Sequence, residues 1–207
     1  MRAGQRALWL AVDPLLLASR SAVRQKLLVE AGIPVEVRPA DLDERALEAA
    51  MPYASPSAGA ALLARAKAAA VERLNPGRLT LGADQTLALG VERFAKPADR
   101  GAARAQLRAL SGRAHELHSA IAFVQNTKVL FEYVGVARLT MRALSDRFLD
   151  LYLDAAGAAA TGSVGAYQLE GLGIQMFERV DGDYFTVLGL PLMEVVDFLR
   201  RHGCLAQ

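Results

Sequence analysis

The stretch from Leu15 to Gly32 constrains the fold more than any other part of this 207-residue chain. An apolar run that ends at Ala18 is followed by a polar turn at 19–21, after which apolar residues recur at helical spacing. This order predicts a buried strand, a turn and a helix capped by Ser21. Such a unit belongs in an α/β sheet, and the start of its helix can bind an anion because unpaired N–H groups and the helix dipole point there.

The rest of the chain alternates between helical and extended patterns. Alanine supplies 39 residues and is densest between Pro56 and Asn75, which favours a long amphipathic helix. Two alternating stretches, 115–124 and 129–141, are joined by a polar turn and predict a hairpin. We therefore predict an α/β fold with a mixed sheet flanked by helices, in one domain over residues 1–207.

Composition and charge exclude several classes of protein. Lys and Arg number 24 and Asp and Glu 22, and the net charge of +2 is far too small for a general binder of polymeric nucleic acid. No apolar stretch approaches the roughly 18 residues that a membrane span needs. Cys204, the single cysteine, cannot form an internal disulfide, and with three histidines it supplies too few ligands for structural zinc. We expect a cytoplasmic protein with neither a membrane nor a polymeric nucleic acid as partner.

The first candidate site is the turn at 19–21. It offers the Ser19 hydroxyl, and Arg20 and Arg24 lie beside it. The sequence is neither a P-loop nor a dinucleotide-binding glycine fingerprint, so any phosphate bound here would be held by the helix start and these side chains. The alternative is an ordinary serine-capped helix with solvated arginines.

Asp84 is the second candidate, a lone carboxylate at the C-terminal edge of the apolar stretch 79–83. Open α/β sheets place their ligand crevices at such edges, and a carboxylate there suits a general base or an Mg²⁺ ligand. Lys67 and Lys96 are candidate cations, and Asp43, in an acidic run, is a candidate metal ligand. The alternatives are a turn aspartate, surface lysines and a solvated acidic turn.

Two histidine arrangements are less convincing. Ser111, His115 and a distant aspartate could be drawn as a triad, but no Gly-x-Ser-x-Gly elbow surrounds the serine. His115 and His118 are three residues apart in an apparent strand. They therefore point to opposite faces and cannot share a metal.

Taken in order, these segments resemble the Maf family, also called septum-formation-inhibitor-like proteins, over about residues 14 to 203. No single motif is specific, but their number and order are. The matching pieces are Leu15-Leu-Leu-Ala-Ser-Arg-Ser21 with Arg24, Leu27-Leu28, Ala64-Arg-Ala-Lys67, Gly82-Ala-Asp-Gln85, Lys96-Pro97, Leu110-Ser-Gly112 with His115, Gly165-Ala-Tyr167, Glu170-Gly171, and Gly182-Asp-Tyr184 with Gly189-Leu-Pro191.

The resemblance implies an inosine-triphosphatase-like architecture and a nucleoside triphosphate pyrophosphatase that needs Mg²⁺ or Mn²⁺. Such an enzyme cuts between the α- and β-phosphorus and releases pyrophosphate and the monophosphate. Asp84 matches the proposed proton acceptor, which is also a candidate metal ligand. Ser19, Arg24, Lys67 and Lys96 match polar positions of the substrate site. The resemblance also implies a homodimer.

The resemblance bears on the base as well. Gln85 and Glu170 resemble the branch of the family that acts on 7-methyl-GTP, whereas Thr and Gln at these positions mark the branch that acts on dTTP and UTP. A glutamate could accept hydrogen bonds from the N–H groups of guanine. The 7-methyl-GTP branch usually has Trp where this chain has Val23, and the family's Ser-Pro-Arg-Arg is Ser21-Ala-Val-Arg24 here. Two alternatives therefore stand, a dTTP/UTP pyrophosphatase and a nucleotide-binding regulator of septum formation that does not hydrolyse.

Overall fold

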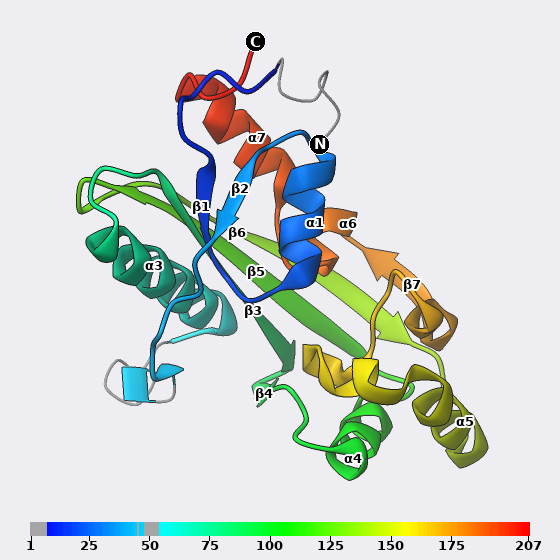
Figure 1. Ribbon diagram of the computed structural model, residues 1–207. Helices are drawn as coiled ribbons and strands as arrows, with labels where there is room; N and C mark the ends of the chain where they lie inside the picture. The colour runs from blue at the N-terminus through cyan, green and yellow to red at the C-terminus, as the bar shows by residue number, and fades with distance from the viewer. Residues whose placement is uncertain (1–7, 45, 48–53) are drawn as a thin grey trace.

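The computed structural model describes residues 8–44, 46–47 and 54–207 (Figure 1). These residues form a seven-stranded sheet with helices on both of its faces. The strands are β1 (Leu15–Ala18), β2 (Val35–Val37), β3 (Thr80–Leu89), β4 (Glu92–Phe94), β5 (Ala114–Gln125), β6 (Lys128–Met141) and β7 (Phe177–Asp181). The α-helices are α1 (Ala22–Glu30), α3 (Pro56–Leu74), α4 (Arg100–Leu110), α5 (Asp146–Ala156), α6 (Tyr184–Val187) and α7 (Leu192–Arg201). Short 3₁₀ helices are η2 (Gly157–Thr161), η3 (Val164–Ala166) and η4 (Leu172–Met176).

The sheet is mixed, as the sequence predicts. Its strand order is β2-β1-β3-β5-β6-β7, with β4 on β3. Strand β1 is parallel to β2 and β3, and the other pairs are antiparallel. The expected hairpin is β5–β6, turning at Asn126 and Thr127 with positive φ at both. The first strand, turn and helix are also confirmed, because Ser21 accepts a hydrogen bond from the Arg24 amide and α1 begins at Ala22.

A gap along one edge of β3 positions the site. Strand β5 pairs with β3 from Thr80 to Ala88 on one side. On the other side, β1 pairs with β3 only as far as Gly82, and β4 pairs with it only from Leu87. Residues 83–86 of β3 therefore lie between the ends of β1 and β4. The prediction that Asp84 ends its strand was wrong, because pairing with β5 carries β3 onward to Leu89; the open edge arises where β1 stops.

The alanine content has a packing reason. Helix α3 lies against one face of the sheet, where Ala60 and Ala64 form an apolar cluster with Ala120 and Ala122 of β5. The approach is so close that a Cβ on Gly82 would lie 2.0 Å from the Ala64 carbonyl oxygen. Small residues are therefore required on both surfaces, since larger side chains would force the helix away from the sheet.

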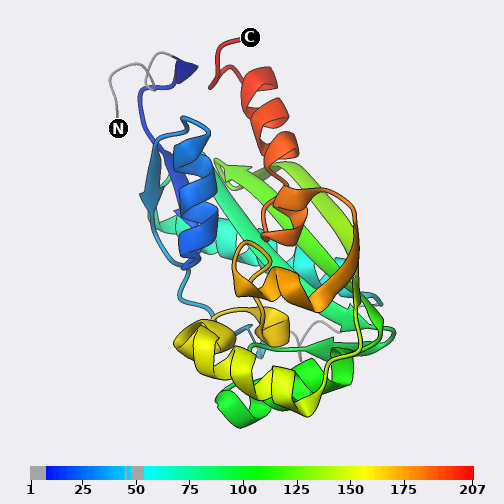
Figure 2. The same cartoon turned by 90° about the vertical axis from the view of Figure 1, so that its right-hand side faces the viewer.

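Two larger cores lie at opposite ends of the long strands. Helices α1 and α7 cover one end, where Leu17, Leu28 and Phe198 are buried in one cluster. Helices α4 and α5 cover the other end, where Leu107 and Leu149 belong to a second cluster. Figures 1 and 2 both show α4 and α5 together at the end of the sheet away from α7. Within the described part of the chain, no helix is long and apolar enough to cross a membrane.

Candidate active site

A pocket of about 650 Å³ opens beside the exposed edge of β3. That volume is within the range of small-molecule sites. The walls come from the β1–α1 turn, residues 40–44, α3, β3, residues 93–96, the segment 162–170 and residues 187–188. Seven residues singled out from the sequence line it, namely Ser19, Arg24, Lys67, Asp84, Gln85, Lys96 and Glu170.

Arg24 is buried at the base of this pocket and joins three segments. Its Nε donates to the Gly189 carbonyl oxygen at 2.7 Å, and its Nη1 donates to the Ala83 carbonyl oxygen at 2.8 Å and the Ser19 hydroxyl at 3.1 Å. Burial lowers the pKa of the guanidinium, and the negative charges of Asp84 and Glu44 oppose that shift. Arg24 thus supplies positive charge to the pocket and also holds its walls together.

Lys67 and Asp84 form an ion pair between α3 and β3. The Lys67 Nζ lies 2.6 Å from Asp84 Oδ1 and 3.0 Å from Glu44 Oε1. The side chains of Lys67 and Asp84 are only 13% and 11% exposed, so the pair is weakly screened by solvent. The Lys67 ammonium therefore contacts two carboxylates, those of Asp84 and Glu44, beside the unpaired edge of β3.

Asp43 does not line the pocket. Its Oδ1 accepts a hydrogen bond from the Ala46 amide at 3.0 Å, so the carboxylate caps a turn. Its neighbour Glu44 is the acidic residue that reaches the pocket and Lys67. The structure thus gives no support to Asp43 as a metal ligand, and Glu44 is the carboxylate of this run that lines the pocket. The acidic run at 41–44 indicated the right segment, but its pattern could not say which carboxylate points inward.

The Gln85 side chain has a fixed orientation. Its Nε2 donates to the Ser119 hydroxyl at 3.0 Å and to the carbonyl oxygens of Val187 at 3.0 Å and Thr186 at 3.3 Å. Carbonyl oxygens only accept, so the amide nitrogen must face them. The Oε1 atom is left to accept a hydrogen bond from a ligand.

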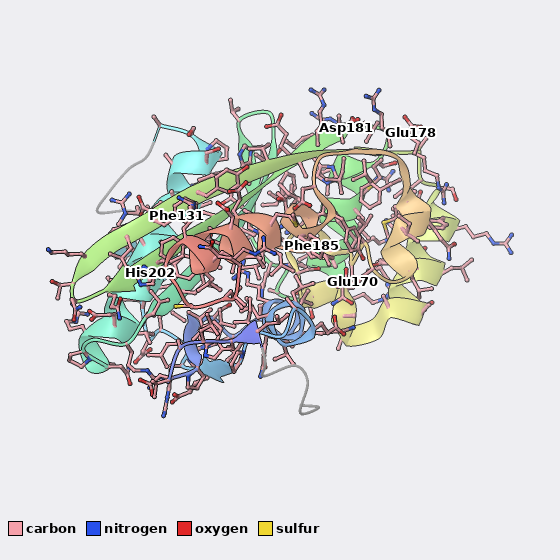
Figure 3. The ribbon with its side chains drawn as sticks, turned by 90° about the horizontal axis from the view of Figure 1, so that it is seen from above. Phe131, Glu170, Glu178, Asp181, Phe185 and His202 are labelled. Carbon is pink, nitrogen blue, oxygen red and sulfur yellow. The ribbon has the colours of Figure 1, made fainter. Side chains whose placement is uncertain are left out.

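The remaining walls carry further polar groups. Lys96 follows β4, and Glu170 lies on the segment between η3 and η4 (Figure 3). Arg20 and Arg93 also line the pocket, which adds positive charge at its rim. Arg93 was missed because a single arginine in a short strand carries no pattern of its own. Tyr167 belongs to the Gly165-Ala-Tyr167 motif and also lines the pocket, but nothing in that motif indicated this position.

The two histidines of β5 point to opposite faces, as predicted. The His115 Nε2 lies 2.7 Å from the Tyr167 hydroxyl, whereas His118 Nδ1 lies 2.8 Å from the Ser57 hydroxyl at the start of α3. Burial lowers the pKa of His115 to about 4 and also lowers that of His118. Ser111 donates no proton to His115; its hydroxyl accepts from the Leu144 amide.

The carboxylates fit a divalent cation that shares its ligands with a substrate. Among the residues that the structure describes, no group of three or more His, Cys, Asp and Glu side chains gathers as a metal site. Three carboxylates line the pocket, those of Asp84, Glu44 and Glu170, and the first two lie within 3.0 Å of the Lys67 ammonium. Mg²⁺ commonly takes one or two carboxylates and completes its shell with water and phosphate oxygens, which matches this donor set.

The fold and the site together define an α/β protein with an open pocket, in which several cationic side chains lie near the carboxylates of Asp84 and Glu44. Such a pocket suits the binding of a phosphorylated small molecule. The chain belongs to the Maf family: the model of that family, described as Maf-like protein, matches residues 14–202. The family prediction from the sequence is therefore confirmed.

Curated relatives match nearly the full length. A "Nucleoside triphosphate pyrophosphatase" of Rhodopseudomonas palustris is 55% identical, with 96% of this chain and 98% of the relative covered. One of the same name from Bradyrhizobium diazoefficiens is 54% identical over the same shares. A "7-methyl-GTP pyrophosphatase" of Mesorhizobium japonicum is 51% identical, with 93% and 98% covered. A solved HAM1 protein from Coxiella burnetii covers 62% of this chain and 72% of its own, with a TM-score of 0.37 and 17% identity.

Proposed function

We propose that this chain is a nucleoside triphosphate pyrophosphatase that hydrolyses the α–β phosphoanhydride and prefers 7-methyl-GTP. The enzyme class follows from family membership and from relatives of that name that are more than half identical over almost the whole chain. The preference rests on Gln85 and Glu170. The observation that carries the proposal is the Lys67–Asp84 pair, which lies in the same pocket as Arg24 and Ser19.

The pocket's own groups account for the chemistry. Arg24, Lys67, Lys96 and the first amides of α1 neutralise charge on the phosphates as it builds up in the transition state. Asp84 accepts the proton of the attacking water, and general-base assistance of this kind contributes roughly 10²–10⁴ in rate. In the ligand-free chain Lys67 is paired with Asp84, and triphosphate oxygens give this ammonium a second set of partners.

Asp84 and Glu44 are the residues that would hold Mg²⁺ or Mn²⁺. When bound, the metal would supply positive charge next to the phosphate oxygens and lower the repulsion between substrate and carboxylates. Asp43 has no part in this proposal, because its carboxylate caps the turn before Ala46.

The base preference is argued from hydrogen-bond acceptors. Gln85 presents Oε1 because both protons of its amide are directed to protein acceptors, and Glu170 adds a carboxylate to the lining of the same pocket. Guanine carries N–H donors on both N1 and its exocyclic nitrogen, whereas uracil and thymine carry one N–H on that edge. Two acceptors therefore suit a guanine better than a pyrimidine. Val23 also lines the pocket and offers apolar contact, without the stacking surface of a tryptophan.

A competition assay tests this preference. The enzyme with Mg²⁺ is given 7-methyl-GTP together with UTP or dTTP, and each monophosphate is quantified. We expect 7-methyl-GMP to dominate and the double variant Gln85→Thr/Glu170→Gln to shift the ratio toward the pyrimidines. The matched control is Glu178→Gln, the same chemical change on β7, which Figure 3 shows away from Glu170; this variant should leave the ratio unchanged.

The outcomes separate the alternatives. A wild-type preference for UTP or dTTP would refute the assignment of Gln85 and Glu170 and favour the pyrimidine branch. Binding of nucleotides without hydrolysis under Mg²⁺ and Mn²⁺ would favour the regulator of septum formation. The resemblance further supports a homodimer, and light scattering after size exclusion would give the mass of the assembly. The single Cys204 supports a reducing, cytoplasmic setting.

A further inference from the structure

One wall of the pocket is a short segment with a constrained backbone. Residues 163–170 follow η2 and carry Glu170 to the pocket. Within this segment Gly165 has φ +81° and Ala166 has φ +63°. Positive φ at a residue with a side chain costs on the order of 1 kcal/mol and persists only where the surroundings enforce it. The position of the Glu170 carboxylate therefore depends on whatever holds this segment against the sheet.

Three side-chain hydrogen bonds order the segment, two to other elements and one within it. The Tyr152 hydroxyl donates to the Ala166 carbonyl oxygen at 3.2 Å, and the Ser163 hydroxyl donates to the Tyr167 carbonyl oxygen at 2.6 Å. The third joins His115 Nε2 and the Tyr167 hydroxyl at 2.7 Å. Only this third bond attaches the segment directly to the central sheet, because His115 lies on β5 whereas Tyr152 lies on α5.

Tyr167 also fills the space beneath the wall. Its ring lies edge-on to Phe177, with centroids 4.8 Å apart. A Cβ on Gly165 would lie 2.6 Å from both the Tyr167 ring and the Leu87 side chain, so the backbone runs close over both. A shift of the tyrosine ring would therefore move the backbone that leads to Glu170.

His115 is placed to act on the wall and not on the substrate. Its side chain is 1% exposed and does not line the pocket. Its Nδ1 has no hydrogen-bond partner within the described ranges, and burial keeps the ring neutral at physiological pH by lowering its pKa to about 4. The unexposed imidazole has Tyr167 as its hydrogen-bond partner.

We propose that His115 is a positioning residue for base recognition, which fixes the Glu170-bearing wall of the pocket through its hydrogen bond to Tyr167. The proposal rests on the proposed function, since it assumes that this wall meets the base of a nucleotide. Removing the bond should weaken recognition of the base and leave the chemistry at Asp84 intact, because Asp84 and Lys67 are held by β3 and α3.

The test compares two replacements of similar size. His115→Met removes the hydrogen bond, whereas His115→Gln retains an amide nitrogen near the position of Nε2. For each variant, kcat and KM are measured with 7-methyl-GTP and with UTP, and the free energy of unfolding is measured in urea. Tyr167→Phe removes the same bond from the other side, and it serves if His115→Met does not fold.

We expect His115→Met and Tyr167→Phe to raise KM for 7-methyl-GTP about tenfold, since a lost hydrogen bond that leaves a buried group unpaired has an effect of this size. The kcat should stay within about twofold, the preference over UTP should fall by the same factor as KM rises, and His115→Gln should restore most of it. The double variant His115→Met/Tyr167→Phe should have a KM for 7-methyl-GTP no higher than that of either single variant, because both changes remove the same bond.

Variants that lose stability but keep KM and the ratio of 7-methyl-GTP to UTP would overturn the proposal, as would a fall in kcat alone. Failure of the proposed function gives a different result, which the wild-type enzyme alone would show: no pyrophosphate release from any nucleotide tested, or a preference for UTP over 7-methyl-GTP.

Discussion

Replacing Arg24 by lysine keeps the positive charge of the pocket and removes most of the hydrogen bonds that join its walls. The guanidinium donates hydrogen bonds to the carbonyl oxygens of Ala83 and Gly189 and to the Ser19 hydroxyl, and all three bonds are buried. A lysine ammonium is a compact point charge without the planar fork, so it can reach about one of these acceptors. The others lose a charged donor, at about 1–3 kcal/mol each, and we expect Arg24→Lys to lower the free energy of unfolding by roughly 2–6 kcal/mol.

Urea unfolding followed by circular dichroism measures this change directly. The matched control is Arg20→Lys, the same replacement at an exposed arginine in the same turn, for which we expect a change within about 0.5 kcal/mol. The thermal midpoint of Arg24→Lys should fall by about 4–24 °C, since each kcal/mol corresponds to about 2–4 °C for a chain of this size. If Arg24→Lys is as stable as Arg20→Lys, the three bonds do not support the pocket and the reasoning is refuted.

Three further results are expected. Glu72, which is 2% exposed, accepts hydrogen bonds from the amides of Gly77, Asn126 and Thr127. Glu72→Ala leaves these amides without an acceptor, so it should lower the free energy of unfolding by about 3 kcal/mol or more. An unchanged midpoint in urea would contradict this. Stability should fall as the pH drops from about 6.5 to 4, because burial lowers the pKa of folded His115 to about 4 and the unfolded chain takes up a proton that the folded chain does not. His115→Gln should remove up to about 3 kcal/mol of this pH dependence, which urea midpoints across that range would measure. EDTA should abolish pyrophosphate release and Mg²⁺ or Mn²⁺ should restore it, whereas full activity in EDTA would exclude a role for divalent metal.

Much of the fold follows from local patterns. The cap at Ser21, the turn at Asn126 and the alanine-rich helix each depend on residues close in sequence, and each is present in the structure. The exact place of Asp84 does not follow, because its strand is extended by pairing with β5, which comes more than 30 residues later. The unpaired edge beside Asp84 arises because β1 pairs with β3 only as far as Gly82 and β4 only from Leu87. Local periodicity carries no information about these limits of pairing.

The site shows the same division. Family motifs indicated seven of the pocket residues, yet the motifs do not say that Arg24 is a support for the walls or that Lys67 pairs with Asp84. The choice between Asp43 and Glu44 depends on which way a short acidic turn faces. Likewise, the bond between His115 and Tyr167 joins segments 52 residues apart. Such contacts are products of tertiary packing and have no signature in a single sequence.

The most direct test of the proposed function is product analysis of 7-methyl-GTP hydrolysis by the wild-type chain and by Asp84→Asn, with Mg²⁺ present. The proposed function predicts that the wild-type chain releases pyrophosphate and 7-methyl-GMP in equal amounts. It predicts a rate at least about 10²-fold lower for Asp84→Asn, which cannot accept the proton from water. Equal rates in the two proteins would remove Asp84 from the mechanism, and release of orthophosphate with the diphosphate would contradict cleavage between the α- and β-phosphorus.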